Sequence, residues 1–134
     1  SSEVEERQDE YILLADNDET NVEVLKNVFE NLKYKTKAAY TGDEIVELCN
    51  EKRPLLIISE MMLPKQDAIQ VYRNLQKTTN TKNIPFIMIS SLKNEDAVKS
   101  SYALGINYFL KKPYLIAELT GLSQNIIRGN EIES

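Results

Sequence analysis

The chain of 134 residues has no histidine, no tryptophan and only one cysteine, Cys49. Without histidine there is no imidazole base, no Ser-His-Asp or Cys-His catalytic group, and the commonest zinc ligand is missing. A single cysteine cannot form an internal disulfide, which fits a reducing cytoplasm, and it excludes a structural zinc site. Any metal bound to this chain should therefore be a hard cation held by oxygen atoms.

Long hydrophobic runs and an excess of basic charge are also missing. The formal net charge is −5, which disfavours nucleic acid and anionic membrane surfaces as direct partners, because both attract basic patches. No apolar run approaches the roughly 20 residues that span a bilayer, and no signal-peptide pattern opens the chain. We expect a cytoplasmic protein with a single folded domain.

The chain does contain four short apolar runs, and each ends at a polar or charged residue. The runs are 11–15, 55–59, 86–89 and 108–110, and the residues at their ends are Asp16, Glu60, Ser90 and Lys111 with Lys112. If the runs are parallel strands of one sheet, their carboxyl ends lie along the edge where open α/β sheets place their sites. Two acids, a hydroxyl and an ammonium would meet there, which is typical of a phosphate or metal pocket.

Helical periodicity alternates with these strands. The segments with an apolar stripe at helical spacing are 22–32, 43–51, 69–75, 94–104 and 115–126, and a further short strand is expected at 36–40. Five strand–helix units predict a parallel sheet with helices on both faces. We expect a polar tail or linker at 1–10, a domain at 11–128 that closes with Gly129 just past the last helix, and at 129–134 a tail or linker to a further domain.

Five segments, taken together and in order, resemble the receiver domain of two-component response regulators. They are 12–18, 42–44, 54–64, 84–91 and 105–113, and the resemblance covers nearly all of 11–128. It implies the family's fold, a flavodoxin-like (βα)5 doubly wound parallel five-stranded sheet in a three-layer sandwich, which agrees with the strand–helix pattern.

The resemblance also implies chemistry at the strand ends. In the family, two adjacent acids after the first strand and an aspartate after the third hold Mg²⁺, and that aspartate accepts a phosphoryl group from a histidine of a partner kinase. A Ser or Thr after the fourth strand and a Lys before a Pro after the fifth bind the phosphoryl oxygens. The cations neutralise charge on the transferring group. A chain without histidine fits this scheme, because the donor lies on another protein.

Several residues match the family's positions. Asp16 corresponds to the first acid, Ser90 to the hydroxyl, Lys112 to the ammonium and Phe109 to a switching aromatic, although Phe109 is also a natural core residue. The resemblance further assigns the backbone carbonyl of Met62 to the metal, with Asp16 and the acid at the phosphoacceptor position.

Two positions depart from the family pattern. Glu60 stands at the phosphoacceptor position and Asn17 replaces the second acid. The extra methylene moves the carboxylate of Glu60 outward by roughly 1–1.5 Å, and about 1 Å of misplacement can cost on the order of 100-fold in rate. Asn17 removes one charge from the metal site, worth roughly 4 kcal/mol at 4 Å before desolvation. We therefore expect weakened Mg²⁺ binding and a direct pairing of Glu60 with Lys112, with Ser90 close enough to add a hydrogen bond.

These observations leave several functions open. The favoured one is a signalling module that works without phosphorylation and binds a protein partner or a second copy through the face formed by 94–104, 108–110 and 115–126. The alternative is a weak Mg²⁺-dependent phosphoacceptor supplied by a sensor histidine kinase. A flavin carrier on the same fold is disfavoured, because the turn at 16–20 is acidic where a flavin phosphate needs Gly, Ser or Thr. A domain of this fold with no retained function also stays open.

Overall fold

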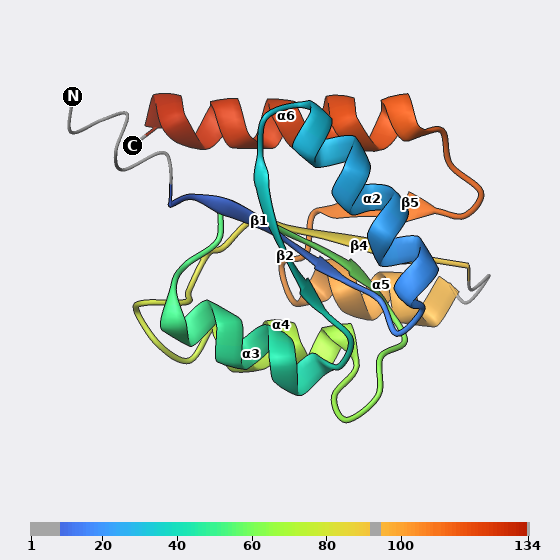
Figure 1. Ribbon diagram of the computed structural model, residues 1–134. Coiled ribbons are helices and arrows are strands. Elements are labelled where there is room, and N and C mark those ends of the chain that lie inside the picture. Colours follow the sequence, from blue (N-terminus) through green and yellow to red (C-terminus); the bar gives the residue numbers. More distant parts are fainter. Residues whose placement is uncertain (1–8, 92–94, 134) are drawn as a thin grey trace.

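The computed structural model describes residues 9–91 and 95–133 and shows a five-stranded sheet between two layers of helices (Figure 1). The strands are β1 (Tyr11–Ala15), β2 (Lys35–Ala39), β3 (Leu56–Glu60), β4 (Phe86–Ser90) and β5 (Tyr108–Lys111). The helices are α2 (Glu19–Asn31), α3 (Gly42–Glu51), α4 (Ala68–Leu75), α5 (Glu95–Ala103) and α6 (Ile116–Glu133).

All strand pairs are parallel, and the strand order is β2-β1-β3-β4-β5. Helices α2 and α6 cover one face of the sheet, and α3, α4 and α5 cover the other (Figure 1). The predicted flavodoxin-like fold is confirmed. Strands are added to one side of β1 at first and to the other side from β3 onward, and ligands of doubly wound sheets bind beyond the strand ends at this switch between β1 and β3.

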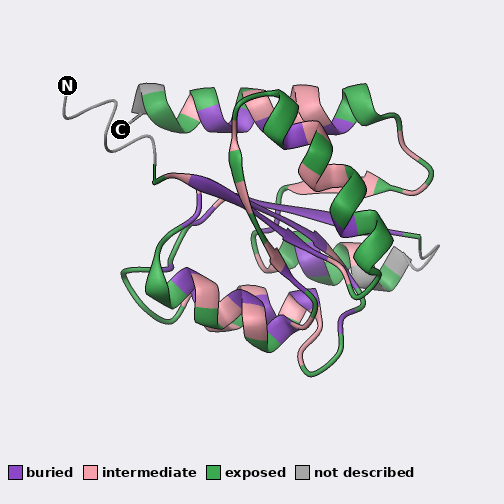
Figure 2. Cartoon of the chain, viewed as in Figure 1, coloured by how far each residue is buried: buried purple, intermediate pink, exposed green. Residues whose placement is uncertain are grey.

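Three of the four apolar runs become the central strands β1, β3 and β4, which are buried on both faces, and the fourth run becomes the edge strand β5. Every residue of β1 and β4 is buried, and Figure 2 shows the central strands as the most continuously buried part of the chain. Side chains alternate between two core clusters, one under α3 and α4 and one under α2 and α6. The strand β2 lies at an edge, and its exposed Lys35 and Lys37 discourage pairing with another chain.

Local signals begin three of the helices. The side chains of Asp18, Thr41 and Asp67 accept hydrogen bonds from backbone N–H groups in the first turns of α2, α3 and α4.

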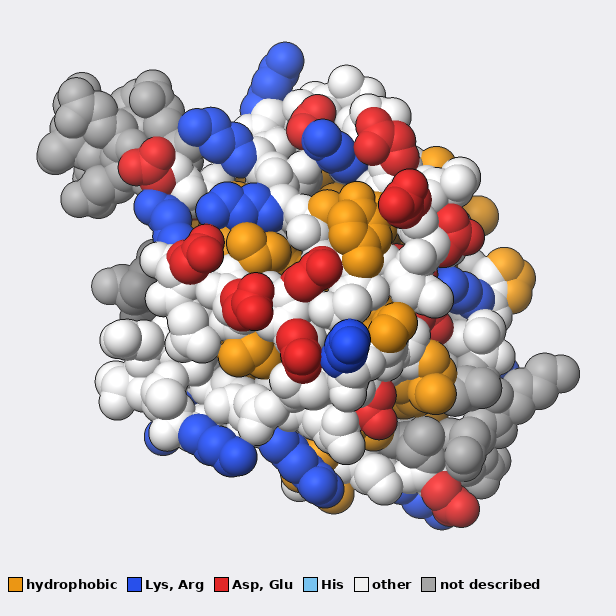
Figure 3. Space-filling view, turned by 60° about the horizontal axis from the view of Figure 1, so that its bottom comes forward, with side chains coloured by type: hydrophobic (Ala, Val, Ile, Leu, Met, Phe, Trp, Pro, Cys, Tyr) orange, Lys and Arg blue, Asp and Glu red, His pale blue; other side chains and the backbone are white. Residues whose placement is uncertain are grey.

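Seen from the side of α3 and α4, acidic and basic side chains are interspersed on the surface (Figure 3). Within the described residues, no helix is long and apolar enough to cross a membrane.

The end of the last helix differs from the prediction. We expected α6 to close near Arg128 with Gly129 just past it, but the helix continues to Glu133. A Cβ added at Gly129 would meet nothing within 4 Å, so this glycine is not needed for a close approach that would end the helix. A glycine inside a helix costs only about 1 kcal/mol, and the buried Ile126 and Ile127 anchor the preceding turn.

The second strand also begins one residue earlier than predicted, at Lys35. Residues 1–8 of the expected tail and Asn94 of the expected fourth helix lie outside the described residues.

Candidate functional site

The sheet register brings the charged residues at the strand ends together. Ala15 pairs with Ser59, so Asp16 and Glu60 stand side by side at the carboxyl ends of β1 and β3. Ser90 pairs with Lys111, and the backbone N–H of Lys112 donates to the carbonyl of Ser90 at 2.9 Å. The strand order therefore gathers at one edge the residues that the sequence pattern predicted there.

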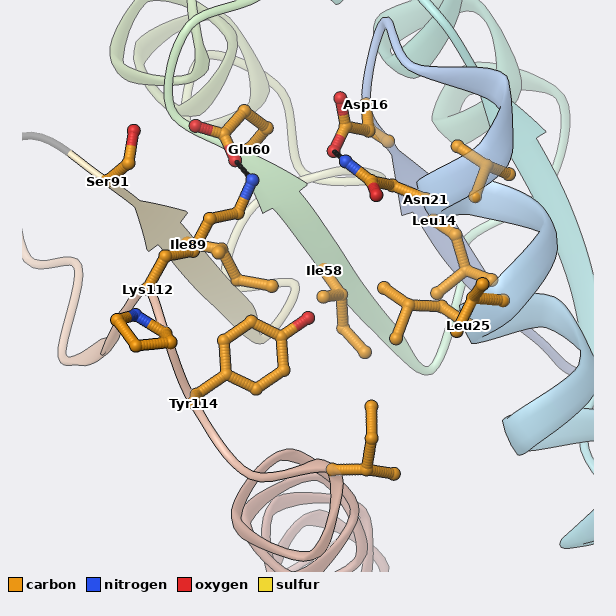
Figure 4. A pocket seen from close by; sticks show the side chains of 15 residues that line it. Leu14, Asp16, Asn21, Leu25, Ile58, Glu60, Ile89, Ser91, Lys112 and Tyr114 are labelled. Atoms are coloured by element: carbon orange, nitrogen blue, oxygen red, sulfur yellow. Dashed lines mark hydrogen bonds and ion pairs between the residues drawn. The ribbon is translucent and has the colours of Figure 1, made fainter.

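Glu60 and Lys112 form an ion pair at the centre of this edge. Nζ of Lys112 lies 2.7 Å from Oε2 of Glu60, an oxygen that is itself buried (Figure 4). The Glu60 side chain is 12% exposed and the Lys112 side chain 33% exposed. Desolvation lowers the pKa of Lys112, but the hydrogen bond and the charge of Glu60, together with the charge of Asp16, outweigh it and raise this pKa above its usual value. The predicted pairing of Glu60 with Lys112 is confirmed.

Asp16 is oriented by the first turn of α2. Its Oδ1 accepts a hydrogen bond from the backbone N–H of Asp18 at 3.0 Å, and its Oδ2 accepts one from Nδ2 of Asn21 at 3.2 Å. Asn21 was not among the predicted site residues. Asn21 could have been predicted from its position in the first turn of the helix that follows Asp16, because an amide side chain there can reach back to the strand end. Both donors are uncharged groups.

Strand alternation separates Ser90 from the ion pair. Ile58 and Ile89 belong to the core cluster on the α2 and α6 side, so Glu60 follows Ile58 onto that side and Ser90 faces the other. The Ser90 hydroxyl is buried and donates to Sδ of Met61 at 3.8 Å. The next residue, Ser91, lines the pocket instead (Figure 4). The role assigned to Ser90 remains a prediction.

The other predicted site residues lie around the pocket or away from it. Asn17 and Met62 are exposed, Met62 to 57%. Phe109 is partly buried against the core under α3 and α4, and its ring lies 5.7 Å from that of the exposed Tyr102. This position suits a core residue, and the switching role of Phe109 stays a prediction, as do the metal roles of Asn17 and Met62.

A cavity of about 590 Å³ opens beside these charged groups, between the first turns of α2 and the connection from β5 to α6. Apolar side chains form most of its walls, and the sequence pattern did not predict it. Tyr114 projects its hydroxyl into this space (Figure 4). Burial raises the pKa of Tyr114, the charge of Lys112 lowers it, and the charges of Asp16 and Glu60 raise it again, so the hydroxyl stays protonated well above neutral pH.

Across residues 9–91 and 95–133, no group of three His, Cys, Asp or Glu side chains is placed to hold a metal ion. Asp16 and Glu60 supply two carboxylates, but Lys112 already neutralises one of them. The arrangement can therefore stabilise the strand ends electrostatically without a metal.

The fold and this edge define a class: a doubly wound domain with a carboxylate and lysine site at the carboxyl ends of its strands. The family model for the response regulator receiver domain matches residues 12–123. The chain belongs to the response regulator receiver domain family of two-component signalling, whose members are signalling modules that interact with histidine kinases and other proteins.

Individual relatives agree with this assignment. The chain is 28% identical over 121 residues to the alkaline phosphatase synthesis transcriptional regulatory protein PhoP of Bacillus subtilis, covering 90% of this chain and 50% of that protein. A receiver domain of a signal transduction histidine kinase from Syntrophus aciditrophicus superposes with a TM-score of 0.83 at 28% identity, covering 90% of this chain and 91% of that one.

A third relative carries a metal. The receiver domain of sensor histidine kinase PA1611 from Pseudomonas aeruginosa, described with a magnesium ion coordinated in its active site cleft, superposes with a TM-score of 0.80 at 24% identity, covering 88% of this chain and 97% of that one. At this identity the likeness shows the fold. The chain spans about half the length of the curated relatives it matches.

Proposed function

We propose that this receiver domain signals without phosphorylation and acts as a protein-interaction module in a two-component system. The observation that carries the proposal is the 2.7 Å ion pair between Glu60 and Lys112. In the family scheme the lysine binds a phosphoryl oxygen and the acid accepts the phosphoryl group. Here the two side chains bind each other, and the carboxylate of Glu60 takes the place of a phosphoryl oxygen beside Lys112. The pair therefore imitates part of a phosphorylated pocket.

Charge and geometry both oppose phosphoryl transfer at this site. Attack on a phosphoryl group needs cations that neutralise the developing charge, and Lys112 is engaged by the acid that would attack. Asn17 supplies no charge where the family has its second acid. Magnesium binding, seen in the PA1611 receiver, should be weakened here for the same reason.

The proposed contact face is formed by α5, β5 and α6. The strand β5 is an edge of the sheet, and Tyr102 of α5 is 52% exposed while its ring leans on Phe109 of β5. An exposed tyrosine packed on a partly buried phenylalanine suits a protein contact, since tyrosine combines apolar area with a polar tip. The partner is another protein of the signalling system, a sensor histidine kinase included, or a second copy.

The test is a set of amide NMR spectra recorded while Mg²⁺ and then beryllofluoride, a phosphoryl mimic, are added. We expect no localised shifts at Asp16, Glu60 or Lys112 at millimolar Mg²⁺ or below, with or without the mimic. The double variant Asn17→Asp/Glu60→Asp, which rebuilds the family's acids, is the positive control and should respond to both additions. Localised shifts in the unaltered protein that grow with the mimic would instead favour the phosphoacceptor function.

A further inference from the structure

The cavity beside the ion pair has the walls and the charge of a ligand site. We propose that it binds a small organic cation: a molecule with one protonated amine on a compact apolar body. The inference rests on the shape and charge of the cavity, and it holds whether or not Glu60 accepts a phosphoryl group.

The size and the walls of the cavity suit a small molecule. Its volume of about 590 Å³ lies within the range of ligand sites, roughly 300–1,000 Å³. The walls include Val24 of α2 and Ile116 of α6, which remain 49% and 41% exposed. An apolar body seated between them would remove their surface from water, which is favourable.

The charge of the cavity selects a cation. Asp16, Glu60 and Lys112 are the charged side chains among its lining residues, and they sum to −1. Lys112 forms its ion pair with Glu60 and also attracts Asp16, whose hydrogen-bond donors, from Asp18 and Asn21, are uncharged. A protonated amine beside Asp16 would be attracted, and an anion there would be repelled.

A second polar group is aimed into the same space. Tyr114 is half-buried and its hydroxyl points into the cavity toward Ile58 (Figure 4). In the part of the chain that the structure describes, this hydroxyl has no hydrogen-bond partner. It can therefore donate to or accept from a ligand. A few convergent polar groups on apolar walls are the usual composition of a small-molecule site.

The absence of tryptophan makes this proposal directly measurable. Three indole compounds of similar size serve as probes: tryptamine, which is cationic, tryptophol, which is neutral, and indole-3-propionate, which is anionic. Their fluorescence anisotropy is followed as protein is added, with excitation where tyrosine does not absorb. We expect tryptamine to bind at least about tenfold more tightly than tryptophol, and indole-3-propionate to bind most weakly. Added salt should reduce this preference, because Asp16 is partly exposed.

Two charge variants form a matched control. Asp16→Asn removes the selecting charge and should reduce the preference for tryptamine over tryptophol by about tenfold. Glu23→Gln removes one charge from an exposed residue of α2 that does not line the cavity, and it should leave the preference unchanged. The amide spectrum of each variant confirms that it is folded. Val24→Gln makes one wall polar and should weaken binding of all three probes.

Three outcomes would overturn the proposal: no anisotropy change at millimolar protein, equal binding of the three probes, or equal selectivity in the Asp16→Asn variant and the unaltered chain. Failure here is distinguishable from failure of the proposed function. A response to beryllofluoride would refute signalling without phosphorylation and would leave the cation site standing. If only tryptamine binding fails, the cation site is refuted and signalling without phosphorylation stands.

Discussion

Nζ of Lys112 and Oε2 of Glu60 lie 2.7 Å apart, yet the carboxylate side chain is far more buried than the ammonium side chain, 12% exposed against 33%. The buried carboxylate of Glu60 therefore depends on Lys112 as its counter-ion. Lys112 depends less on Glu60, because its more exposed ammonium group can be solvated by water instead. This asymmetry leads to a prediction about the two single variants.

Lys112→Met should destabilise the domain more than Glu60→Gln. The first change leaves a buried carboxylate without a counter-ion and should cost about 2–4 kcal/mol, and the second leaves a lysine that reaches solvent and should cost about 1–2 kcal/mol. The double variant should cost less than the sum of the two, which urea unfolding of all four proteins will measure. The pair Lys52 and Asp9, 3.9 Å apart and exposed, is the matched control, and its coupling should stay below about 1 kcal/mol. Additive costs at Glu60 and Lys112 would show that the ion pair contributes no coupling.

Rebuilding the family's acids should restore phosphoryl transfer. With a small phosphoryl donor and Mg²⁺, the unaltered chain should keep its intact mass, and Asn17→Asp/Glu60→Asp should gain the mass of one phosphoryl group. Glu60→Asp alone should react more slowly, because the metal site still lacks one charge. Replacing Lys112 by Met in the double variant is the control that should abolish the gain. Phosphorylation of the unaltered chain would contradict the proposed function.

Gly42→Ala should unfold the start of α3. A Cβ at Gly42 would lie 2.1 Å from the carbonyl oxygen of Gln66 in the segment that follows Glu60, and backbone cannot yield as a flexible side chain can. We expect a loss of about 2–3 kcal/mol in thermal or urea unfolding. Gly129→Ala is the control: a Cβ there meets nothing, so helix propensity alone should raise stability by about 0.5–1 kcal/mol. Equal effects at the two glycines would rule out the close approach at Gly42.

Tyr11→Phe should lower stability at neutral pH and reduce its loss in alkali. The Tyr11 hydroxyl donates to the carbonyl of Lys52 at 2.6 Å and lies 3.2 Å from that of Leu48, so its removal should cost about 1–1.5 kcal/mol. Burial first, then the charges of Cys49 and Glu51, raise the pKa of Tyr11 far above 10. The folded state then holds the proton that the unfolded state loses near pH 10, so stability is full below that pH and falls as the pH rises further.

Urea unfolding at pH 8 and at pH 11 measures this effect. The buried thiol of Cys49, with its pKa raised to about 12 by burial, contributes in the same direction and stays in the variant. The stability lost between the two pH values should therefore shrink, but not vanish, in Tyr11→Phe. An unchanged loss would mean that Tyr11 titrates as readily in the folded state as in the unfolded one.

The sequence by itself determined the class of fold and which charged residues meet at the sheet edge. Central parallel strands are buried on both faces, so β1, β3 and β4 appear as continuous apolar runs that end where the chain meets solvent. The polar endings therefore predicted which residues share the sheet edge, and the pairing of Glu60 with Lys112 followed from their types. Asn17 and Glu60 were visible as departures from the family pattern because each lies inside a segment that otherwise matches the family.

Only the tertiary structure decided which way the side chains at that edge point and what space they enclose. Ser90 and Ser91 are equivalent in sequence, but the pleat of β4 sends the first toward Met61 and the second to the pocket wall. Asn21, Tyr114 and the cavity depend on where α2 and the connection to α6 lie over the sheet, which local periodicity does not encode. The continuation of α6 through Gly129 was likewise decided by its surroundings, because the buried Ile126 and Ile127 anchor the preceding turn and one half-buried glycine costs a helix only about 1 kcal/mol.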